Sequence, residues 1–276
     1  MESALPLALD GCTIKVVHTI KDAAVELQRL IDYLYGCPPT ERLLGLDCEW
    51  LQGQKGSHID LIQLCVGSQG NEDIVLIRTN GRGQKKCPTG LVQLLAIKHL
   101  KIGGNRVQGD LTRMAKYYGE SSMARSDKIC DLSNLAMERG VTVYGKGENT
   151  LTNLCRRVLG VHLHKSVTAR DSDWRKSSLT KEQIQYAALD ALASLRVLKG
   201  LLLMRDLTVP LQPQDAQRGL IVDICPLEGS RMCRAASAGK AIIVSDPLHH
   251  PSLPPGIQVS RVITVGFLMI ISKVQL

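Results

Sequence analysis

Apolar residues recur along the chain with the periods of strands and helices in turn. Short runs rich in Ile, Leu and Val predict strands over residues 13–19, 43–50, 58–66 and 73–78. A Gly-Ser-Gln-Gly-Asn turn signal separates the last two runs and predicts an antiparallel hairpin. Helical spacing over residues 22–35 predicts a helix that ends before a Gly-Cys-Pro-Pro break. We therefore expect the first three strands of a sheet to form a meander.

Helices and strands alternate further along the chain. Helices are expected at 91–99, 109–118, 132–139 and 150–159, with short strands at 100–103 and 128–131. After a polar loop to residue 178, Thr180 opens a long helix with a Thr-Lys-Glu-Gln start signal, and this helix runs to residue 205. The whole pattern predicts an α/β fold, with a mixed sheet flanked by helices on both faces.

The last part of the chain has a different character. Pro210 and Pro213 indicate a linker, and strand-like runs follow at 220–224, 241–244 and 257–271. We divide the chain into a domain at 14–205, and a linker with a C-terminal extension of unassigned fold at 206–276. The extension also holds four potential zinc ligands, whose spacing matches no common zinc pattern: Cys225, Cys233, His249 and His250.

Composition and charge narrow the range of functions. With 276 residues and 44% hydrophobic content, the chain can build a sizeable core. Nine cysteines without a Cys-x-x-Cys pair indicate reduced, mostly buried thiols. A formal charge of +8 suits a polyanionic partner such as nucleic acid. Because 3% of the residues are aromatic, a broad base-stacking platform like that of single-strand binding proteins is disfavoured.

The sequence also bears on location. The apolar segment at residues 262–271 is far shorter than the ~20 residues of a membrane-spanning helix, so no membrane span is expected. The first eleven residues contain Glu2 and Asp10 but no Lys or Arg, unlike a signal peptide or an import presequence. We expect a nuclear or cytoplasmic protein, and association with an organelle stays open.

Five residues are candidates for chemistry. Asp47 and Glu49 stand two apart in a predicted strand, so both carboxylates point to the same face. Asp110 follows a glycine-bearing turn before a helix, where an acid can also serve as a helix cap. Tyr186 and Asp190 are four apart on the long helix and share one of its faces. Taken alone, each signal also has a purely structural explanation.

In their order along the chain, these five residues resemble the motifs of the DEDDy superfamily of 3'-5' exonucleases. The likeness extends to ribonuclease D, to the Werner exonuclease domain and most of all to the exonuclease 3'-5' domain-containing proteins. It rests on Leu-His-Lys-Ser at 163–166, Ser-Asp-Trp at 172–174 and Leu-Thr-Lys-Glu-Gln at 179–183. One departure is Gly-Gly-Asn-Arg at 103–106, where relatives more often carry a Val-Gly-Val-Gly type of run.

The resemblance implies a ribonuclease H-like fold and hydrolysis with two Mg²⁺ or Mn²⁺ ions about 4 Å apart. It implies that Asp47, Glu49 and Asp190 hold the ion that activates water, and that Asp47 also bridges to a second ion supported by Asp110. It further implies that Tyr186 orients the attacking water, a role that a phenol with a pKa of about 10 can fill. The implied substrate is a 3'-ended DNA or RNA.

Several alternatives stay open. Lys165 could contact a substrate phosphate or pair with a carboxylate. Strand alternation turns Trp50 away from the two acids beside it, so we expect core packing for Trp50 and also for Trp174. The rival to an active exonuclease is a catalytically silent protein that keeps the fold and binds nucleic acid or a protein partner. The sequence does not distinguish DNA from RNA as the substrate.

Overall fold

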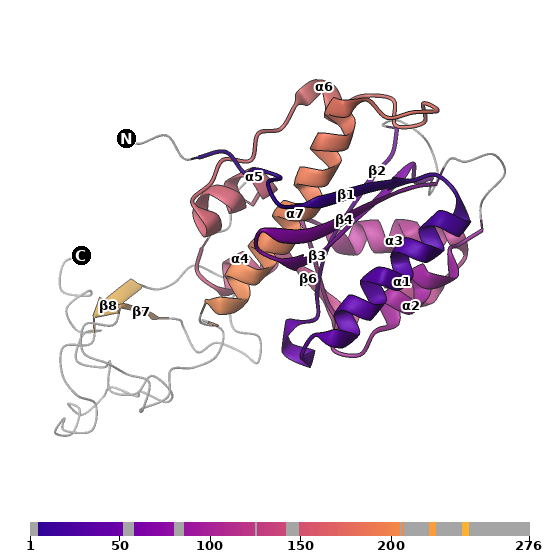
Figure 1. The fold of residues 1–276 in the computed structure, drawn as a ribbon. Coiled ribbons are helices and arrows are strands. Elements are labelled where there is room, and N and C mark those ends of the chain that lie inside the picture. The colour runs from indigo at the N-terminus through magenta and orange to yellow at the C-terminus, as the bar shows by residue number, and fades with distance from the viewer. Residues whose placement is uncertain are drawn as a thin grey trace. The chain divides into compact units, whose positions relative to one another are not determined.

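The computed structural model describes residues 5–51, 58–79, 86–124, 126–141, 149–204, 206, 221–224 and 239–242. The chain divides into two compact units: Met1–Met137 with Gly145–Met204, and Glu138–Tyr144 with Arg205–Leu276. The first unit contains the main sheet and its helices (Figure 1). In the second unit, β7 (Ile221–Ile224) and β8 (Gly239–Ile242) pair antiparallel, where the sequence predicts two strands.

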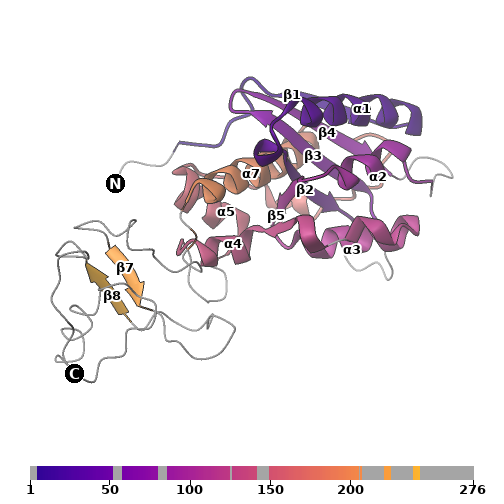
Figure 2. The same cartoon turned by 90° about the horizontal axis from the view of Figure 1, so that it is seen from below.

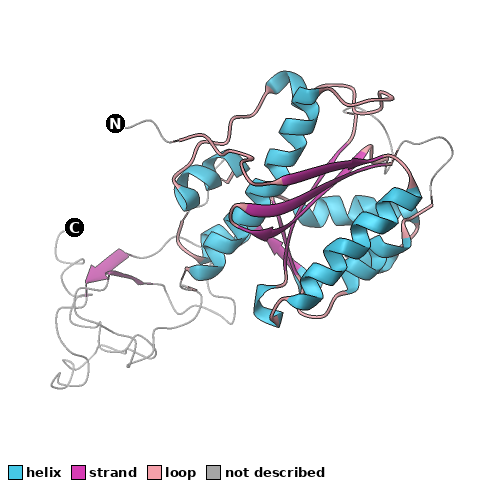
Figure 3. Ribbon diagram, viewed as in Figure 1, coloured by secondary structure: helices cyan, strands magenta, loops and turns pink. Residues whose placement is uncertain are grey.

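A six-stranded mixed sheet forms the centre of the first unit (Figure 3). Its spatial order is β1-β4-β3-β2-β5-β6. The strands are β1 (Thr13–Val17), β2 (Leu43–Glu49), β3 (Leu61–Ser68), β4 (Asn71–Arg78), β5 (Lys101–Gly104) and β6 (Ile129–Asp131). The pairs β2–β3 and β3–β4 are antiparallel, whereas β1–β4, β2–β5 and β5–β6 are parallel.

The predicted hairpin is confirmed as β3 and β4, but the meander consists of β2, β3 and β4 and does not include the first strand. Helix α1 (Ile20–Gly36) connects β1 to β2, and such a crossover leaves β1 parallel to β4 at the edge of the sheet. A tight turn would be needed for β1 to join the meander.

Helices cover both faces of the sheet, as the sequence predicts (Figures 1 and 2). Helices α1, α2 (Thr89–Ala96) and α3 (Val107–Tyr118) pack on one face, where they share a buried core with β2 side chains. Helix α7 (Lys181–Leu203) lies on the other face and contacts β2, β3, β4 and β5. The short helices α5 (Leu151–Leu154) and α6 (Val167–Arg170) contact α7, and α4 (Leu132–Glu138) follows β6.

Alternation along β2 decides which side chains face which layer. Leu44, Leu46 and Cys48 are buried in the core shared with α1, α2 and α3. Gly45 faces α7, because a Cβ atom built on it would lie 2.7 Å from the backbone nitrogen of Leu195. With a period of two, the side chains of residues 47 and 49 share the face of Gly45. The candidate acids therefore point toward the long helix.

Capping residues fix where the two long helices begin. The Thr19 hydroxyl accepts a hydrogen bond from the backbone nitrogen of Asp22 at the start of α1. At the start of α7, Thr180 and Gln183 form a reciprocal capping box, which is the start signal expected from the sequence. This cap anchors the first turns of the helix that carries the predicted Tyr and Asp.

The segment between residues 150 and 178 differs from prediction. The expected helix at 150–159 consists of α5 followed by a turn of π-helix at Cys155–Leu159, and Gly160 ends it in the left-handed conformation. The expected polar loop contains α6. A π-helix needs i→i+5 hydrogen bonds, which no simple spacing of apolar residues distinguishes from α-helix.

Three further expectations concern the chain as a whole. The strand run at 257–271 and the four potential zinc ligands lie outside the described residues. The cysteines that the structure describes are all free thiols, but they are not mostly buried as expected: Cys48, Cys65 and Cys155 are buried, whereas Cys12, Cys37, Cys87 and Cys130 are half-buried. Among the described helices, none combines the length and the apolar character needed to cross a membrane.

Candidate metal centre

Two of the predicted acids stand at the end of the central strand. Asp47 and Glu49 are in the last three residues of β2, and their carboxylates point to the face of the sheet that α7 covers. The backbone nitrogen of Cys48 donates to Oδ1 of Asp47 at 2.9 Å, which holds that carboxylate in place. Both acids lie beyond Gly45, the last residue of β2 that pairs with the parallel strand β5, and both are still paired with β3.

Helix α7 brings the third acid to the same place. Asp190 is 1% exposed, and a carboxylate oxygen of each of Asp47, Glu49 and Asp190 lies within 4.8 Å of the others. Asp47 and Asp190, which are 143 positions apart in the chain, thus meet because α7 crosses β2 at Gly45. Three carboxylates at this separation can share one cation, since hard divalent ions such as Mg²⁺ and Mn²⁺ prefer oxygen ligands.

Asp110 lies beside this trio but is not one of the three converging ligands. It is in the first turn of α3 and is 6% exposed. Burial, and then the charge of Asp47, raise the pKa of Asp110 to about 9. Asp47 and Asp110 are therefore close enough to interact electrostatically, as expected for groups on either side of a common site.

Burial governs the electrostatics of the trio. Burial first, and then the charge of Asp190, raise the pKa of Asp47 to about 7. Burial and the charges of Asp47 and Asp190 also raise the pKa of Glu49 well above its ordinary value. The pKa of Asp190 is raised by burial as well, although Lys165 opposes the shift. Such a cluster favours a bound cation, which would stabilise the ionised forms together.

Tyr186 is placed as the sequence predicts, one turn before Asp190 on α7. Burial, followed by the charges of Asp190 and Glu49, raises the pKa of its phenol. The ring lies 6.1 Å from that of Trp174, centroid to centroid. With its pKa raised, Tyr186 keeps its proton and can act as a hydrogen-bond donor rather than as a base.

Lys165 is paired with a carboxylate, which was one of the two possibilities open from the sequence. Its Nζ lies 2.8 Å from Oδ1 and 3.0 Å from Oδ2 of Asp190. The side chain is 30% exposed, so the ammonium lies at the border between the buried acids and solvent. It also stands 5.4 Å from the centroid of the Tyr186 ring. Sequence analysis did not place this lysine among the site residues.

Gln63 is a neighbour of the acids that sequence analysis missed entirely. It lies on β3 directly opposite Asp47, so its side chain shares the face of the carboxylates. It is 0% exposed. The signal was present, because Gln63 is the single polar residue between Leu61 and Val66. A strand that is buried on both faces shows no alternation of apolar and polar residues. The sequence therefore did not indicate which face of the sheet the Gln63 side chain is on.

Both tryptophans pack with the core, as expected, Trp174 inside it and the half-buried Trp50 against it. Trp50 packs against the buried cluster, and the guanidinium carbon of Arg113 lies 4.0 Å from its ring centroid. Trp174 is 0% exposed, and its indole nitrogen donates to the carbonyl oxygen of Arg170 at 3.3 Å. Neither ring belongs to the carboxylate trio.

A family model described as 3'-5' exonuclease matches residues 17–205. The chain belongs to this 3'-5' exonuclease family. The match spans β2, α3 and α7, and so includes each of the five predicted site residues. The family resemblance read from the sequence motifs is confirmed.

Relatives of this exonuclease domain share part of their length with it. The exonuclease 3'-5' domain-containing protein 2 of Mus musculus is 32% identical over 162 residues, which are 58% of this chain and 24% of that protein. The bifunctional 3'-5' exonuclease/ATP-dependent helicase WRN of Mus musculus is 28% identical over 162 residues, 58% of this chain and 11% of that protein. The chain thus matches about a quarter or less of the length of these two relatives.

A solved structure shows the same fold. The catalytic core of RRP6 from Trypanosoma brucei superposes with a TM-score of 0.52 at 16% sequence identity, covering 73% of this chain and 49% of that one. The expected ribonuclease H-like architecture, a mixed sheet with helices on both faces, is therefore confirmed for the exonuclease domain.

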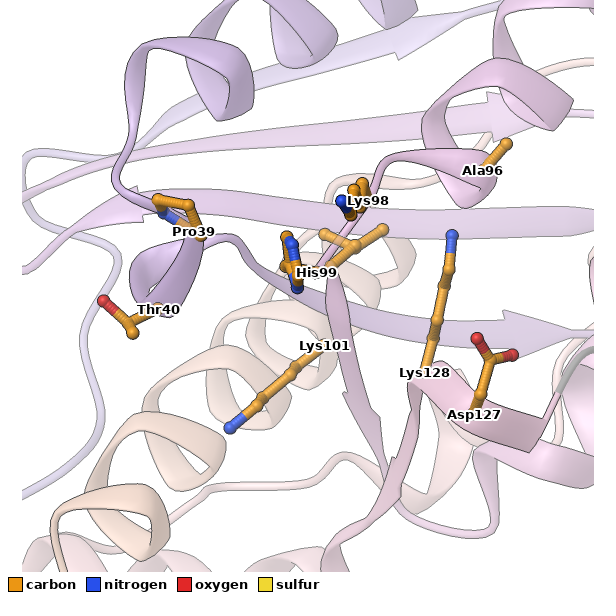
Figure 4. Close-up of a pocket in the computed structure, with 9 residues that line it drawn as sticks. Pro39, Thr40, Ala96, Lys98, His99, Lys101, Asp127 and Lys128 are labelled. Carbon is orange, nitrogen blue, oxygen red and sulfur yellow. The ribbon is translucent and has the colours of Figure 1, made fainter.

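A hollow of ≈ 600 Å³ lies beside the other end of β2, and it does not belong to the carboxylate site. Its lining includes Lys98, Lys101 and Lys128 but none of the five predicted site residues. In Figure 4 these three lysine side chains point in different directions. The Nζ atom of Lys128 donates to the carbonyl oxygens of Leu95 and Ile97 at 3.1 and 2.9 Å. The lysines therefore do not converge on a single anion.

Proposed function

We propose that the chain is a divalent-metal-dependent 3'-5' exonuclease, which hydrolyses phosphodiester bonds from the 3' end of DNA or RNA and releases nucleoside 5'-monophosphates. The observation that carries the proposal is the convergence of three buried or half-buried carboxylates from β2 and α7 in a member of the exonuclease family. Raised pKa values mark these acids as groups that need a cation in order to ionise together.

The donor set fits Mg²⁺ or Mn²⁺, because it consists of carboxylates that need not supply every ligand position. Asp47, Glu49 and Asp190 would hold one ion, and Asp47 with Asp110 would hold the second. When bound, the pair of ions would supply an activated water and stabilise the leaving 3' oxygen. The position of Asp110 beside the trio supports its role at the second ion rather than the first.

Tyr186 would orient the attacking water. Its phenol lies one helical turn before Asp190, one of the acids that would hold the first ion, and it retains its proton because its pKa is raised. A donor fixed in this way restricts the approach of water to the phosphorus atom. The side chain of Trp174 packs against the ring and limits its freedom to move.

The substrate would be bound largely through its phosphates. The formal charge of +8 favours a polyanion without selecting a base sequence. Few aromatic side chains are available for stacking, so recognition of a single 3' end is favoured over coating of a long strand. The choice between deoxyribose and ribose is part of the test.

The experiment compares wild-type protein with Asp190→Asn and Asp47→Ala. Each is incubated with a matched DNA or RNA oligonucleotide and Mg²⁺, Mn²⁺ or EDTA, and the released mononucleotides are identified by chromatography. We expect nucleoside 5'-monophosphates from the wild type with either ion, none with EDTA, and a rate at least 100-fold lower in the two variants, since loss of a key electrostatic group costs on the order of 10² or more.

The matched control is Asp32→Asn, which removes an exposed carboxylate from α1, a helix on the opposite face of the sheet from α7. It should release nucleotides at the wild-type rate. If the trio variants remained as active as this control, the proposed site would be wrong. If wild-type protein bound the oligonucleotides but released nothing with either ion, a catalytically silent binding protein would be the better account.

A further inference from the structure

Gln63 stands between the two acids of β2 on their own face of the sheet. It pairs with Asp47 in the β2–β3 register, and Glu49 is the next residue of β2 on that face. In an antiparallel pair, a diagonal neighbour of this kind lies about 7–8 Å away between Cα atoms, within reach of two long side chains. The Gln63 amide is thus aimed at the site from the sheet, opposite the helix that carries Asp190.

The amide is buried without a firm partner. Gln63 is 0% exposed, and neither Oε1 nor Nε2 makes a hydrogen bond of full geometry with any residue in the described ranges. An amide in this state destabilises the fold, because it has lost water and gained little in return.

The buried amide of Gln63 has an explanation if it fixes the position of the Glu49 carboxylate. A carboxylate that holds a metal ion with one oxygen usually has its other oxygen fixed by a neighbouring donor, and loss of that donor typically weakens metal affinity or activity. The backbone nitrogen of Cys48 supplies such a donor to Asp47, and Lys165 supplies one to Asp190. The Glu49 carboxylate has no such donor among the described residues, and Gln63 is a buried amide without a hydrogen-bond partner on the same face of the sheet.

We propose that Gln63 is a positioning residue for Glu49. Once Glu49 is ionised in the metal-bound site, the Gln63 Nε2 would donate to one oxygen of its carboxylate and leave the other oxygen to face Asp47 and Asp190. The amide does not touch substrate, because it is wholly buried. This inference rests on the proposed metal-dependent function and adds a residue of β3 to the machinery of that site.

The test separates positioning from structure by measuring Mn²⁺ affinity and stability on the same full-length proteins. Gln63→Met keeps the length of the side chain and removes both polar atoms. We expect its melting temperature in EDTA to equal or exceed that of the wild type, because a buried unpaired amide is lost. We expect its Mn²⁺ affinity, measured by calorimetry, to fall about tenfold or more.

Ser194→Ala is the matched control. Ser194 lies one turn beyond Asp190 on α7, is 1% exposed, and its hydroxyl also has no hydrogen-bond partner among the described residues. Its removal should likewise leave the melting temperature unchanged or higher, and it should not alter Mn²⁺ affinity. Gln63→Asn provides a second variant, because it retains the amide on a side chain one methylene shorter and should also bind Mn²⁺ more weakly.

Two outcomes would overturn the inference while leaving the metal site intact. One is wild-type Mn²⁺ affinity in Gln63→Met and Gln63→Asn. The other is a melting temperature that falls in step with Mn²⁺ affinity in both variants, because that result would indicate a structural role. If the wild-type protein itself bound no Mn²⁺, the proposed function would be contradicted, and with it the reason for placing Gln63 at Glu49.

Discussion

Asp190 is 1% exposed and shares a small volume with two other carboxylates, yet three negative charges cannot persist there without compensation. The protein supplies part of that compensation through Lys165, whose ammonium contacts both oxygens of Asp190. Protonation supplies another part, because the pKa of Asp47 is raised to about 7. A divalent ion would replace both, and its binding would therefore release protons.

The protonation of Asp47 predicts how stability depends on pH in EDTA. Between its ordinary pKa of 3.8 and about 7, Asp47 holds a proton in the folded protein that it has lost in the unfolded chain. Stability from this group is complete at low pH and is lost as pH rises through 7. Asp47→Asn should therefore raise the free energy of unfolding by about 2 kcal/mol near pH 8, less than a fully buried group would give.

Urea denaturation of wild type and Asp47→Asn in EDTA, at about pH 5 and about pH 8, measures this effect. The difference between the two proteins should shrink toward the lower pH, because the wild-type carboxyl is then also neutral. A variant that is less stable than the wild type at the higher pH would contradict the assignment of a raised pKa to Asp47.

Lys165→Met should destabilise the protein by about 2 kcal/mol in EDTA, because the buried Asp190 carboxylate loses its cation while a partly exposed lysine limits the cost. Saturating Mn²⁺ should reduce this loss, since the ion would take over the charge of the ammonium. Urea denaturation with EDTA or Mn²⁺ measures both values, with the exposed Lys21→Met as control. Equal losses under the two conditions would show that Lys165 and the ion do not act on the same carboxylate.

Sequence reasoning reached the acids more readily than their surroundings. The period of two placed Asp47 and Glu49 on one face, and the i, i+4 spacing placed Tyr186 with Asp190. These rules hold within one element. Gln63 and Lys165 meet the acids across elements, and no spacing in the sequence encodes the β2–β3 register or the path of the loop before α6.

At the scale of elements, the site depends on how closely α7 approaches the sheet. Gly45 on β2 and Gly103 on β5 face this helix, and a Cβ atom on Gly103 would lie 2.8 Å from Cβ of Leu198. The absence of side chains at these two strand positions allows the helix to lie against the backbone. Asp190 reaches Asp47 because of this close packing.

Gly45→Ala should therefore destabilise the protein by about 2 kcal/mol or more, since the added methyl would meet helix backbone and the packed core cannot absorb it. The control is Gly109→Ala in α3, where a Cβ atom meets nothing within 4 Å and alanine should stabilise by ~1 kcal/mol. Urea denaturation of both variants tests the pair. Similar stability changes of one sign would contradict the role given to the α7–β2 contact.

The sequence predicted where helices and strands form better than it predicted the type of helix at residues 155–159. A capping-box signal predicted the start of the long helix α7, and a turn signal predicted the β3–β4 hairpin. The π-helical turn at Cys155–Leu159 was not predicted, because it differs from α-helix in hydrogen-bond register rather than in the spacing of apolar residues. The position of β1 at the sheet edge was also missed, since a crossover through α1 leaves several pairings open.

At the scale of the whole molecule, a charge of +8 predicts binding that weakens as salt rises. If about three phosphates of a single strand are neutralised, affinity should fall roughly twentyfold between 50 and 200 mM salt. Fluorescence anisotropy of a labelled oligonucleotide with Ca²⁺ in place of Mg²⁺ would measure this. An affinity independent of salt would mean that the net charge does not contribute to recognition.

If the carboxylates that β2 and α7 bring together hold the catalytic ions, the protein should remove nucleotides one at a time from a 3' end. The most direct measurement is a time course on a 5'-labelled single strand, with Mg²⁺ or Mn²⁺, for the wild type and for Asp190→Asn at equal concentration. The account predicts a ladder of products that shortens one nucleotide at a time from the 3' end for the wild type, and an intact strand for the variant. Immediate release of the labelled 5' nucleotide, or the same ladder from Asp190→Asn, would contradict it.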